Sequence, residues 1–168
     1  MDKTKVTKDL ENKTLIIERS FDAPKEKVWQ AYANQAMFEM WWGPEGWEAT
    51  TKVFDFRPGG TIHYGMKCVD KNQVEWFGKE SWGMMKIESV EDASSFTAKD
   101  YFCNAEGELD SQMPAQRFTI EVIEEAGKTK LITQSVVETV EQLEELIKMG
   151  MVEGFNSQLN KLEVLLRT

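Results

Sequence analysis

The C-terminal stretch from Thr139 to Arg167 constrains the fold more than any other part of this sequence. Its apolar and small residues recur every three or four positions between Leu143 and Leu166, and charged residues occupy the opposite side. This spacing predicts one long amphipathic helix. Thr139 followed three residues later by Gln142 is typical of a capping box at the start of a helix. Such a helix would be about 40 Å long, so it needs a broad apolar surface to lie on.

Two glycines, Gly150 and Gly154, fall on the apolar side of this predicted helix. A glycine inside a helix is about 1 kcal/mol less favourable than alanine, so both positions need an explanation. One interpretation is close backbone packing against a bulky neighbour. The other is that the missing side chains leave room for a ligand, and the sequence leaves both open.

The composition narrows the possible partners. The chain has 29 acidic and 20 basic side chains and a net charge of −9, which disfavours nucleic acid and anionic membranes as partners. No apolar run is long enough to span a membrane, and residues 1–13 are unlike a signal peptide. We therefore expect a cytoplasmic protein. Cys68 and Cys103 have no Cys or His clustered around them, which predicts reduced thiols and neither a metal site nor a cofactor.

The order of the predicted elements indicates an α+β fold. Residues 1–13 are expected to be a flexible leader, and residues 14–168 a single domain. A strand at 14–21 precedes two short helices, after which the strands follow one another in hairpins up to the long helix. This order favours a curved antiparallel sheet of about six to seven strands wrapped around the C-terminal helix. The alternation of strand residues breaks near Gly83, where we expect a bulge.

Few residues in the sequence are candidates for catalysis. His63 is the only histidine, and its strand phase predicts an outward-facing, solvated side chain. Asp55 and Arg57 are more typical of a turn-fixing ion pair than of a catalytic pair. Asp100 and Glu80 could enter an interior cavity with a raised pKa, but their strand phase is open. The sequence therefore identifies no catalytic residue.

Several motifs, taken together in order and spacing, resemble the START-like (SRPBCC) helix-grip superfamily, in the branch named after the activator of the heat-shock chaperone ATPase. They are Asp22-Ala23-Pro24 with Val28-Trp29, Trp41-Trp42-Gly43-Pro44, Asp55 to Gly60, Trp82-Gly83, Phe102 to Gly107, and Met151 through Gly154-Phe155. The resemblance implies a cavity between the last helix and the concave sheet, which members of the superfamily use for lipids, hormones, polyketides and other apolar molecules.

The leading hypothesis is therefore that the chain binds a small apolar molecule in such a cavity, with Trp42 and Trp47 at its opening. The predicted lining is Trp42, Trp47, Ile62, Tyr64, Met66, Trp82, Met85, Phe102, Phe118, Ile120, Gly150, Met151, Gly154 and Phe155. One alternative is an interaction or stress-response module like the chaperone-ATPase activator, with a protein partner or a homodimer. Another is a small cyclase or hydrolase, so whether the protein is an enzyme is left open.

Overall fold

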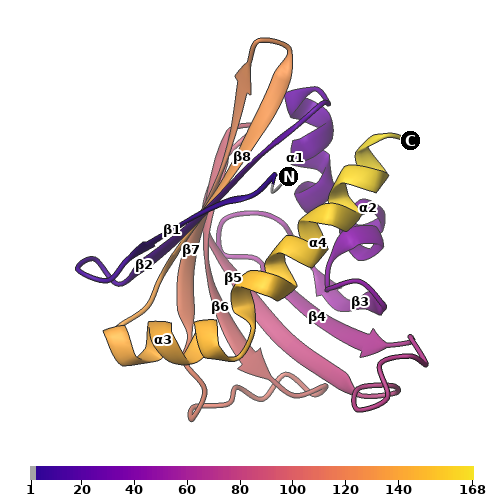
Figure 1. The fold of residues 1–168 in the computed structure, drawn as a ribbon, viewed down its shortest axis with the longest axis vertical. Helices are drawn as coiled ribbons and strands as arrows, with labels where there is room; N and C mark the ends of the chain where they lie inside the picture. The colour runs from indigo at the N-terminus through magenta and orange to yellow at the C-terminus, as the bar shows by residue number, and fades with distance from the viewer. Residues whose placement is uncertain (1–2) are drawn as a thin grey trace.

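A computed structural model describes residues 3–168, which form one eight-stranded antiparallel sheet in the order β1-β2-β8-β7-β6-β5-β4-β3 (Figure 1). The strands are β1 (Lys5–Asp9), β2 (Thr14–Phe21), β3 (Trp47–Phe54), β4 (Thr61–Cys68), β5 (Glu80–Glu91), β6 (Ser95–Cys103), β7 (Gln116–Glu125) and β8 (Lys128–Val136). The helices are α1 (Lys25–Ala33), α2 (Gln35–Trp41), α3 (Val140–Lys148) and α4 (Met151–Leu166).

The sheet curves around α4, which crosses it diagonally (Figure 1). Helix α1 packs on β7 and β8, and α4 packs against α1 and α2. The predicted α+β fold with a curved antiparallel sheet and two short helices after a strand is confirmed. Apolar side chains from the sheet, α1, α2 and the C-terminal helices meet in one continuous core.

The predicted count of six to seven strands is wrong, because the sheet has eight. One unexpected strand is β1, which lies within the segment expected to be a flexible leader. Four of its five residues are exposed, so it carries no apolar signal. It is held as an edge strand by antiparallel pairing with β2. The part of the leader prediction that concerns residues 1–2 falls outside the described residues.

The prediction of a single long C-terminal helix is wrong, because the segment forms two helices, α3 and α4, that meet at Gly150. This residue has a φ of +96°, in the left-handed region that an α-helix cannot continue through. The amphipathic spacing runs across the break, so periodicity alone did not reveal it. The predicted cap at Thr139 is confirmed, because its side chain accepts a hydrogen bond from the Gln142 amide at 3.1 Å.

The start of α2 and the environment of its last residue follow from local signals. Asn34 caps α2 by accepting a hydrogen bond from the Met37 amide at 3.0 Å. Trp41 is fully buried and donates from its indole nitrogen to the Ala31 carbonyl at 2.8 Å. Trp42, which follows, stacks on Phe38 with ring centroids 4.7 Å apart. The two tryptophans therefore join the short helices to the core.

The bulge expected near Gly83 is absent. Gly83 pairs regularly with Tyr64 on one side and Phe102 on the other, and the register shifts of the described sheet lie between Thr51 and Val53 and between Ile87 and Ser89. Gly83 interrupts the side-chain alternation for another reason. A Cβ at this position would overlap the Tyr64 ring, so the glycine makes room for that ring.

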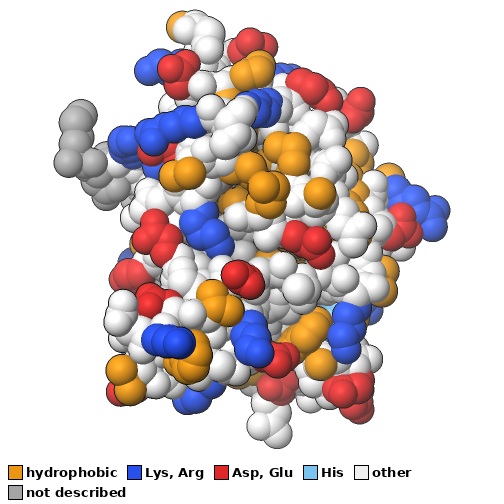
Figure 2. Space-filling view, turned by 90° about the vertical axis from the view of Figure 1, so that its right-hand side faces the viewer, with side chains coloured by type: hydrophobic (Ala, Val, Ile, Leu, Met, Phe, Trp, Pro, Cys, Tyr) orange, Lys and Arg blue, Asp and Glu red, His pale blue; other side chains and the backbone are white. Residues whose placement is uncertain are grey.

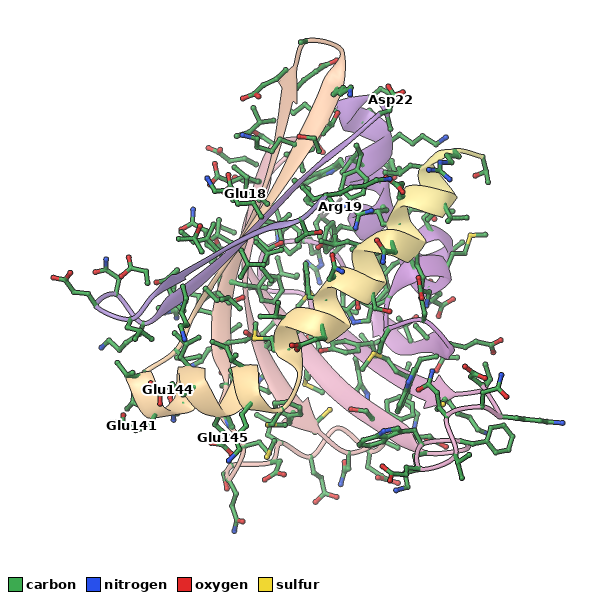
Figure 3. All side chains as sticks on the ribbon, in the orientation of Figure 1. Glu18, Arg19, Asp22, Glu141, Glu144 and Glu145 are labelled. Carbon is green, nitrogen blue, oxygen red and sulfur yellow. The ribbon has the colours of Figure 1, made fainter. Side chains whose placement is uncertain are left out.

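Helix α4 is tied to β2, the strand next to the edge strand β1, by a buried arginine. Arg19 of β2 points toward α4 (Figure 3), donates to Asn160 Oδ1 at 2.7 Å and lies 3.4 Å from a Glu163 carboxylate oxygen. None of the described helices is long and apolar enough to cross a membrane.

On the face that carries α2 and β3, hydrophobic side chains are exposed among acidic and basic ones (Figure 2).

Candidate functional site

A cavity of about 210 Å³ lies between α4 and the concave face of the sheet. It is larger than the roughly 150 Å³ of an apolar cavity that binds benzene. Strands β4, β6, β7 and β8, helices α1 and α4 and the segment after α2 contribute to its wall. The lining residues are Tyr32, Trp42, Pro44, Tyr64, Met66, Asp100, Gln116, Phe118, Ile120, Thr133, Ser135, Met151, Gly154, Phe155 and Gln158.

Gly154 contributes open space to this cavity. A Cβ built at Gly154 would have no atom within 4 Å, other than the backbone of its own helix and its chain neighbours. Close packing against a bulky neighbour therefore does not explain this glycine. The remaining interpretation is that a missing side chain leaves room inside the fold.

A hydrogen bond across the sheet connects Tyr64 of β4 with Asp100 of β6. The Tyr64 hydroxyl lies 2.9 Å and 3.0 Å from the two carboxylate oxygens of Asp100. The tyrosine ring passes over Gly83 of the intervening strand β5 to reach this partner. Three consecutive strands therefore position one polar pair in the cavity wall.

The carboxyl group of Asp100 has an unusual environment. Burial raises its pKa from 3.8 to about 7, while hydrogen bonds from Tyr64 and Gln116 act in the opposite direction. Its side chain is only half-buried by accessible surface, which agrees with its position in a cavity wall. Asp100 is the only lining residue with a carboxylate or a basic group. Near neutral pH it can accept a hydrogen bond or exchange a proton.

Other polar groups of the lining are poorly paired, although the hydroxyl groups of Tyr32 and Thr133 interact with each other. Among the described residues, Tyr32 Oη, Gln116 Oε1, Thr133 Oγ1 and Gln158 Nε2 are buried and make no hydrogen bond of standard geometry. Each such group costs about 1–3 kcal/mol unless something pairs with it. Polar atoms left unpaired around a cavity are typical of a site that receives a hydrogen-bonding molecule.

The roof of the cavity is anchored by polar side chains of α4. The Gly43 amide donates to Gln158 Oε1 at 2.7 Å, and the Glu45 amide donates to Ser157 Oγ at 2.8 Å. Lys161 donates to the carbonyls of Gly43 and Trp47 at 3.1 and 3.0 Å. These bonds fix α4 against the segment that carries Trp42, so the roof has a defined position.

The predicted lining residues lie in several different parts of the structure. Trp42, Tyr64, Met66, Phe118, Ile120, Met151, Gly154 and Phe155 all line the cavity. Ile62 and Met85 are buried in the core, and Gly150 lies at the helix break. Phe102 and Trp82 belong to a neighbouring pocket of about 100 Å³, which shares Tyr64, Met66, Asp100 and Gln116 with the cavity.

Two tryptophans differ from the arrangement that the sequence suggested. The Trp82 ring lies across Gly65 on the outer face of the sheet, where a Cβ on Gly65 would come within 2.6 Å of it. Trp47 is not among the residues that line the cavity. It pairs with Trp76 at 6.2 Å and donates to Gln73 at 3.3 Å. Of the two tryptophans expected at the cavity opening, Trp42 lies in the cavity wall and Trp47 does not.

The prediction that the His63 side chain is solvated is wrong. The side chain is on the outer face, as expected, but only 4% of the residue is exposed. The loop that follows β6 covers it, and His63 Nε2 lies 3.1 Å from the Asn104 carbonyl oxygen. Glu80 accepts a hydrogen bond from Trp82 outside the cavity. Asp55 forms an exposed ion pair with Arg57 at 2.8 Å, in agreement with the turn-fixing interpretation.

Within the polar part of the lining, the sequence offered Asp100 as a candidate with its strand phase left open, but it did not select Tyr32, Gln116, Thr133, Ser135 and Gln158. Two signals were present. Thr133 and Ser135 follow buried Leu131 at every second position of β8, so these small polar residues share its inward face. Gln158 falls on the apolar stripe of α4, where it interrupts the run from Gly154 to Leu162.

The comparisons place these features in a known family. A family model with the description "Activator of Hsp90 ATPase homolog 1-like protein" matches residues 22–167. No curated protein sequence matches the chain.

Solved structures of similar fold cover nearly the whole chain. The crystal structure of protein Ms6760 from Mycobacterium smegmatis is 30% identical, with a TM-score of 0.86 over 97% of this chain and 96% of the other. A solution structure from Arthrobacter aurescens is 26% identical, with a TM-score of 0.87 over 97% and 91% of the two chains. One from Staphylococcus epidermidis is 29% identical, with a TM-score of 0.81 over 97% and 93%.

Proposed function

The chain belongs to the family of Activator of Hsp90 ATPase homolog 1-like proteins, with a START-like helix-grip fold, and from this premise we propose that it binds a small, largely apolar molecule beneath α4. The observation that carries the proposal is the open space at Gly154. A glycine is unfavourable in a helix, yet here its missing side chain enlarges a cavity with an aromatic wall. This arrangement supports a binding function.

The proposal is tested by filling the cavity from the helix side. In the Gly154→Leu variant the added side chain occupies the space that a guest would use. We expect it to abolish binding of ethylbenzene, measured by ligand-observed NMR, while the far-ultraviolet circular dichroism spectrum stays unchanged. Val164→Leu is the matched control, because Val164 lies on the same helix and is exposed. Equal binding by the wild-type protein and Gly154→Leu would contradict this location.

The natural guest can be sought directly. Native mass spectrometry of the protein purified from its own host should reveal a co-purifying small molecule in the wild-type protein and none in Gly154→Leu.

We further propose that the protein works in the cytoplasm. The two cysteines, Cys68 and Cys103, are both unpaired, which suits a reducing compartment.

A second candidate function is interaction with a chaperone, as the description of the family suggests. The loop between β4 and β5 supports it, because Val74 and Trp76 are 84% and 52% exposed and Phe77 lies beside them. Exposed apolar groups of this kind are typical of protein contacts. The test is whether the pure protein raises ATP turnover by Hsp90 from its own host. A Trp76→Ser, Phe77→Ser double variant should lose the effect, whereas Gly154→Leu should retain it.

A further inference from the structure

The chemical character of the cavity points to one class of guest. Asp100 is the only residue with a formal charge among those that line the cavity, and no lysine or arginine lies in the wall. An anionic guest would therefore be buried beside a carboxyl group without a cation to pair with, which is strongly unfavourable. A cationic or hydrogen-bond-donating guest would instead find a partner.

A second acceptor lies next to Asp100. The side chain of Gln116 lines the same cavity as Asp100 and acts on its carboxyl group as a hydrogen-bond donor, which lowers the pKa of Asp100. The other end of this amide, Oε1, is buried and has no partner among the described residues. An ammonium group has three hydrogens to donate. The Asp100 carboxylate and Gln116 Oε1 together can accept two of them.

Aromatic side chains surround the rest of the cavity. Tyr32, Trp42 and Tyr64 form a connected wall, in which the Trp42 ring lies edge-on 5.9 Å from Tyr32 and 5.7 Å from Tyr64. Phe118 and Phe155 also line the cavity. Aromatic rings bind apolar groups and also attract a nearby cation through their π faces. Aromatic walls beside a single carboxylate are suited to an amine with an apolar body.

Resting on the proposed binding function, we propose that the guest is a small organic amine, bound with its ammonium group at Asp100 and Gln116 and its apolar body against the aromatic wall. The cavity of about 210 Å³ admits a single ring with a short side chain. The net charge of −9 favours the approach of cations to the protein.

Four probes of similar size separate the alternatives: phenethylamine, phenethyl alcohol, ethylbenzene and hydrocinnamate. Their affinities are measured by isothermal titration calorimetry or ligand-observed NMR at neutral pH. We expect the amine to bind about tenfold or more tightly than ethylbenzene, because a charge-assisted hydrogen bond is among the stronger polar contacts. We expect hydrocinnamate to bind more weakly than ethylbenzene.

Substitutions of Asp100 and Gln116 test whether these two side chains cause the preference for the amine. Asp100→Asn should reduce the amine-to-ethylbenzene affinity ratio to within about twofold of unity while ethylbenzene still binds. Gln116→Met should lower the ratio by a smaller factor, and it provides a second measurement if Asp100→Asn does not fold. Glu144→Gln makes the same change in net charge on the exposed side of α3 (Figure 3). The ratio should be unchanged in this control.

The outcomes distinguish this inference from the function on which it rests. Loss of the amine preference in Asp100→Asn but not in Glu144→Gln supports it. Binding of ethylbenzene with no preference for the amine, or with a preference for the alcohol or the acid, overturns the inference and leaves the binding function standing. If none of the four probes binds, both are overturned.

Discussion

Tyr64 and Gly83 lie directly opposite each other on β4 and β5, and the tyrosine ring occupies the space that a side chain at Gly83 would fill. This relationship lets the Tyr64 hydroxyl reach Asp100 on β6, which is not a neighbour of β4 in the sheet. The next pair in the register, Gly65 and Trp82, repeats the arrangement on the other face with the roles of the two strands exchanged. Each glycine is therefore required by an aromatic ring on the opposite strand.

The first prediction compares these two glycine–aromatic pairs, Gly83 with Tyr64 and Gly65 with Trp82. Gly83→Ala should displace the Tyr64 ring, break its hydrogen bond to Asp100 and lower the free energy of unfolding by about 1–3 kcal/mol, as overpacking does. Urea denaturation measures the loss, and the ethylbenzene titration measures the effect on the cavity. Gly65→Ala is the matched control, since it displaces Trp82 on the outer face. It should destabilise the fold to a similar extent and leave binding intact, so equal loss of binding in both variants would contradict the prediction.

The second prediction separates the two glycines of the C-terminal segment. Gly154 is inside α4 with open space at its Cβ position, so Gly154→Ala should raise the free energy of unfolding by about 1 kcal/mol. Gly150 has a φ of +96°, so Gly150→Ala should lower it by about 1–2 kcal/mol. Thermal and urea unfolding of the two variants provide the measurement. Stabilisation by both substitutions would instead indicate one continuous helix.

The third prediction concerns the anchor of the cavity roof. Lys161 is half-buried, and burial lowers the pKa of its ammonium group, yet it donates to the Gly43 and Trp47 carbonyls. Lys161→Met keeps the apolar stem but leaves these carbonyls without their donor. We expect a loss of about 2 kcal/mol in urea denaturation. The exposed Lys148 provides the control, because Lys148→Met should cost about 0.5 kcal/mol or less.

Local signals predicted much of this fold. The strand at 14–21, the two short helices that follow it and the cap at Thr139 all depend on neighbours in the sequence, and all are confirmed. The strand β1 was missed because its stability comes from pairing with β2 and not from its own burial.

The candidate site was harder to predict because it depends on contacts between distant strands. Asp100 could not be placed from the sequence, because the alternation of residues breaks near Gly83 and the strand phase was left open. Only the pairing of β4, β5 and β6 brings the Tyr64 hydroxyl to it. The helix break at Gly150 could not be predicted from the sequence, because glycine is compatible with both helical and left-handed backbone conformations.

The last prediction is a pH dependence that arises from Asp100. Its carboxyl has a pKa of about 7 in the folded protein and an ordinary value of 3.8, so between about pH 4 and 7 the folded chain holds a proton that the unfolded chain has released. The unfolded chain then binds fewer protons, and the contribution of Asp100 to stability falls as the pH rises through this window. Tyr64 and Cys103, the titratable groups that interact with it, both have raised pKa values and stay neutral there.

Asp100→Asn removes this penalty. We expect the variant to exceed the wild-type protein in free energy of unfolding by on the order of 4 kcal/mol at about pH 8, and the difference to vanish near pH 4. Urea denaturation at several pH values measures both curves, with Glu144→Gln as the control at an exposed carboxylate. A constant difference across the range would mean that Asp100 titrates normally. A difference confined to the alkaline side would mean that the protein keeps a destabilising carboxylate in its cavity, as a binding site for a cationic guest requires.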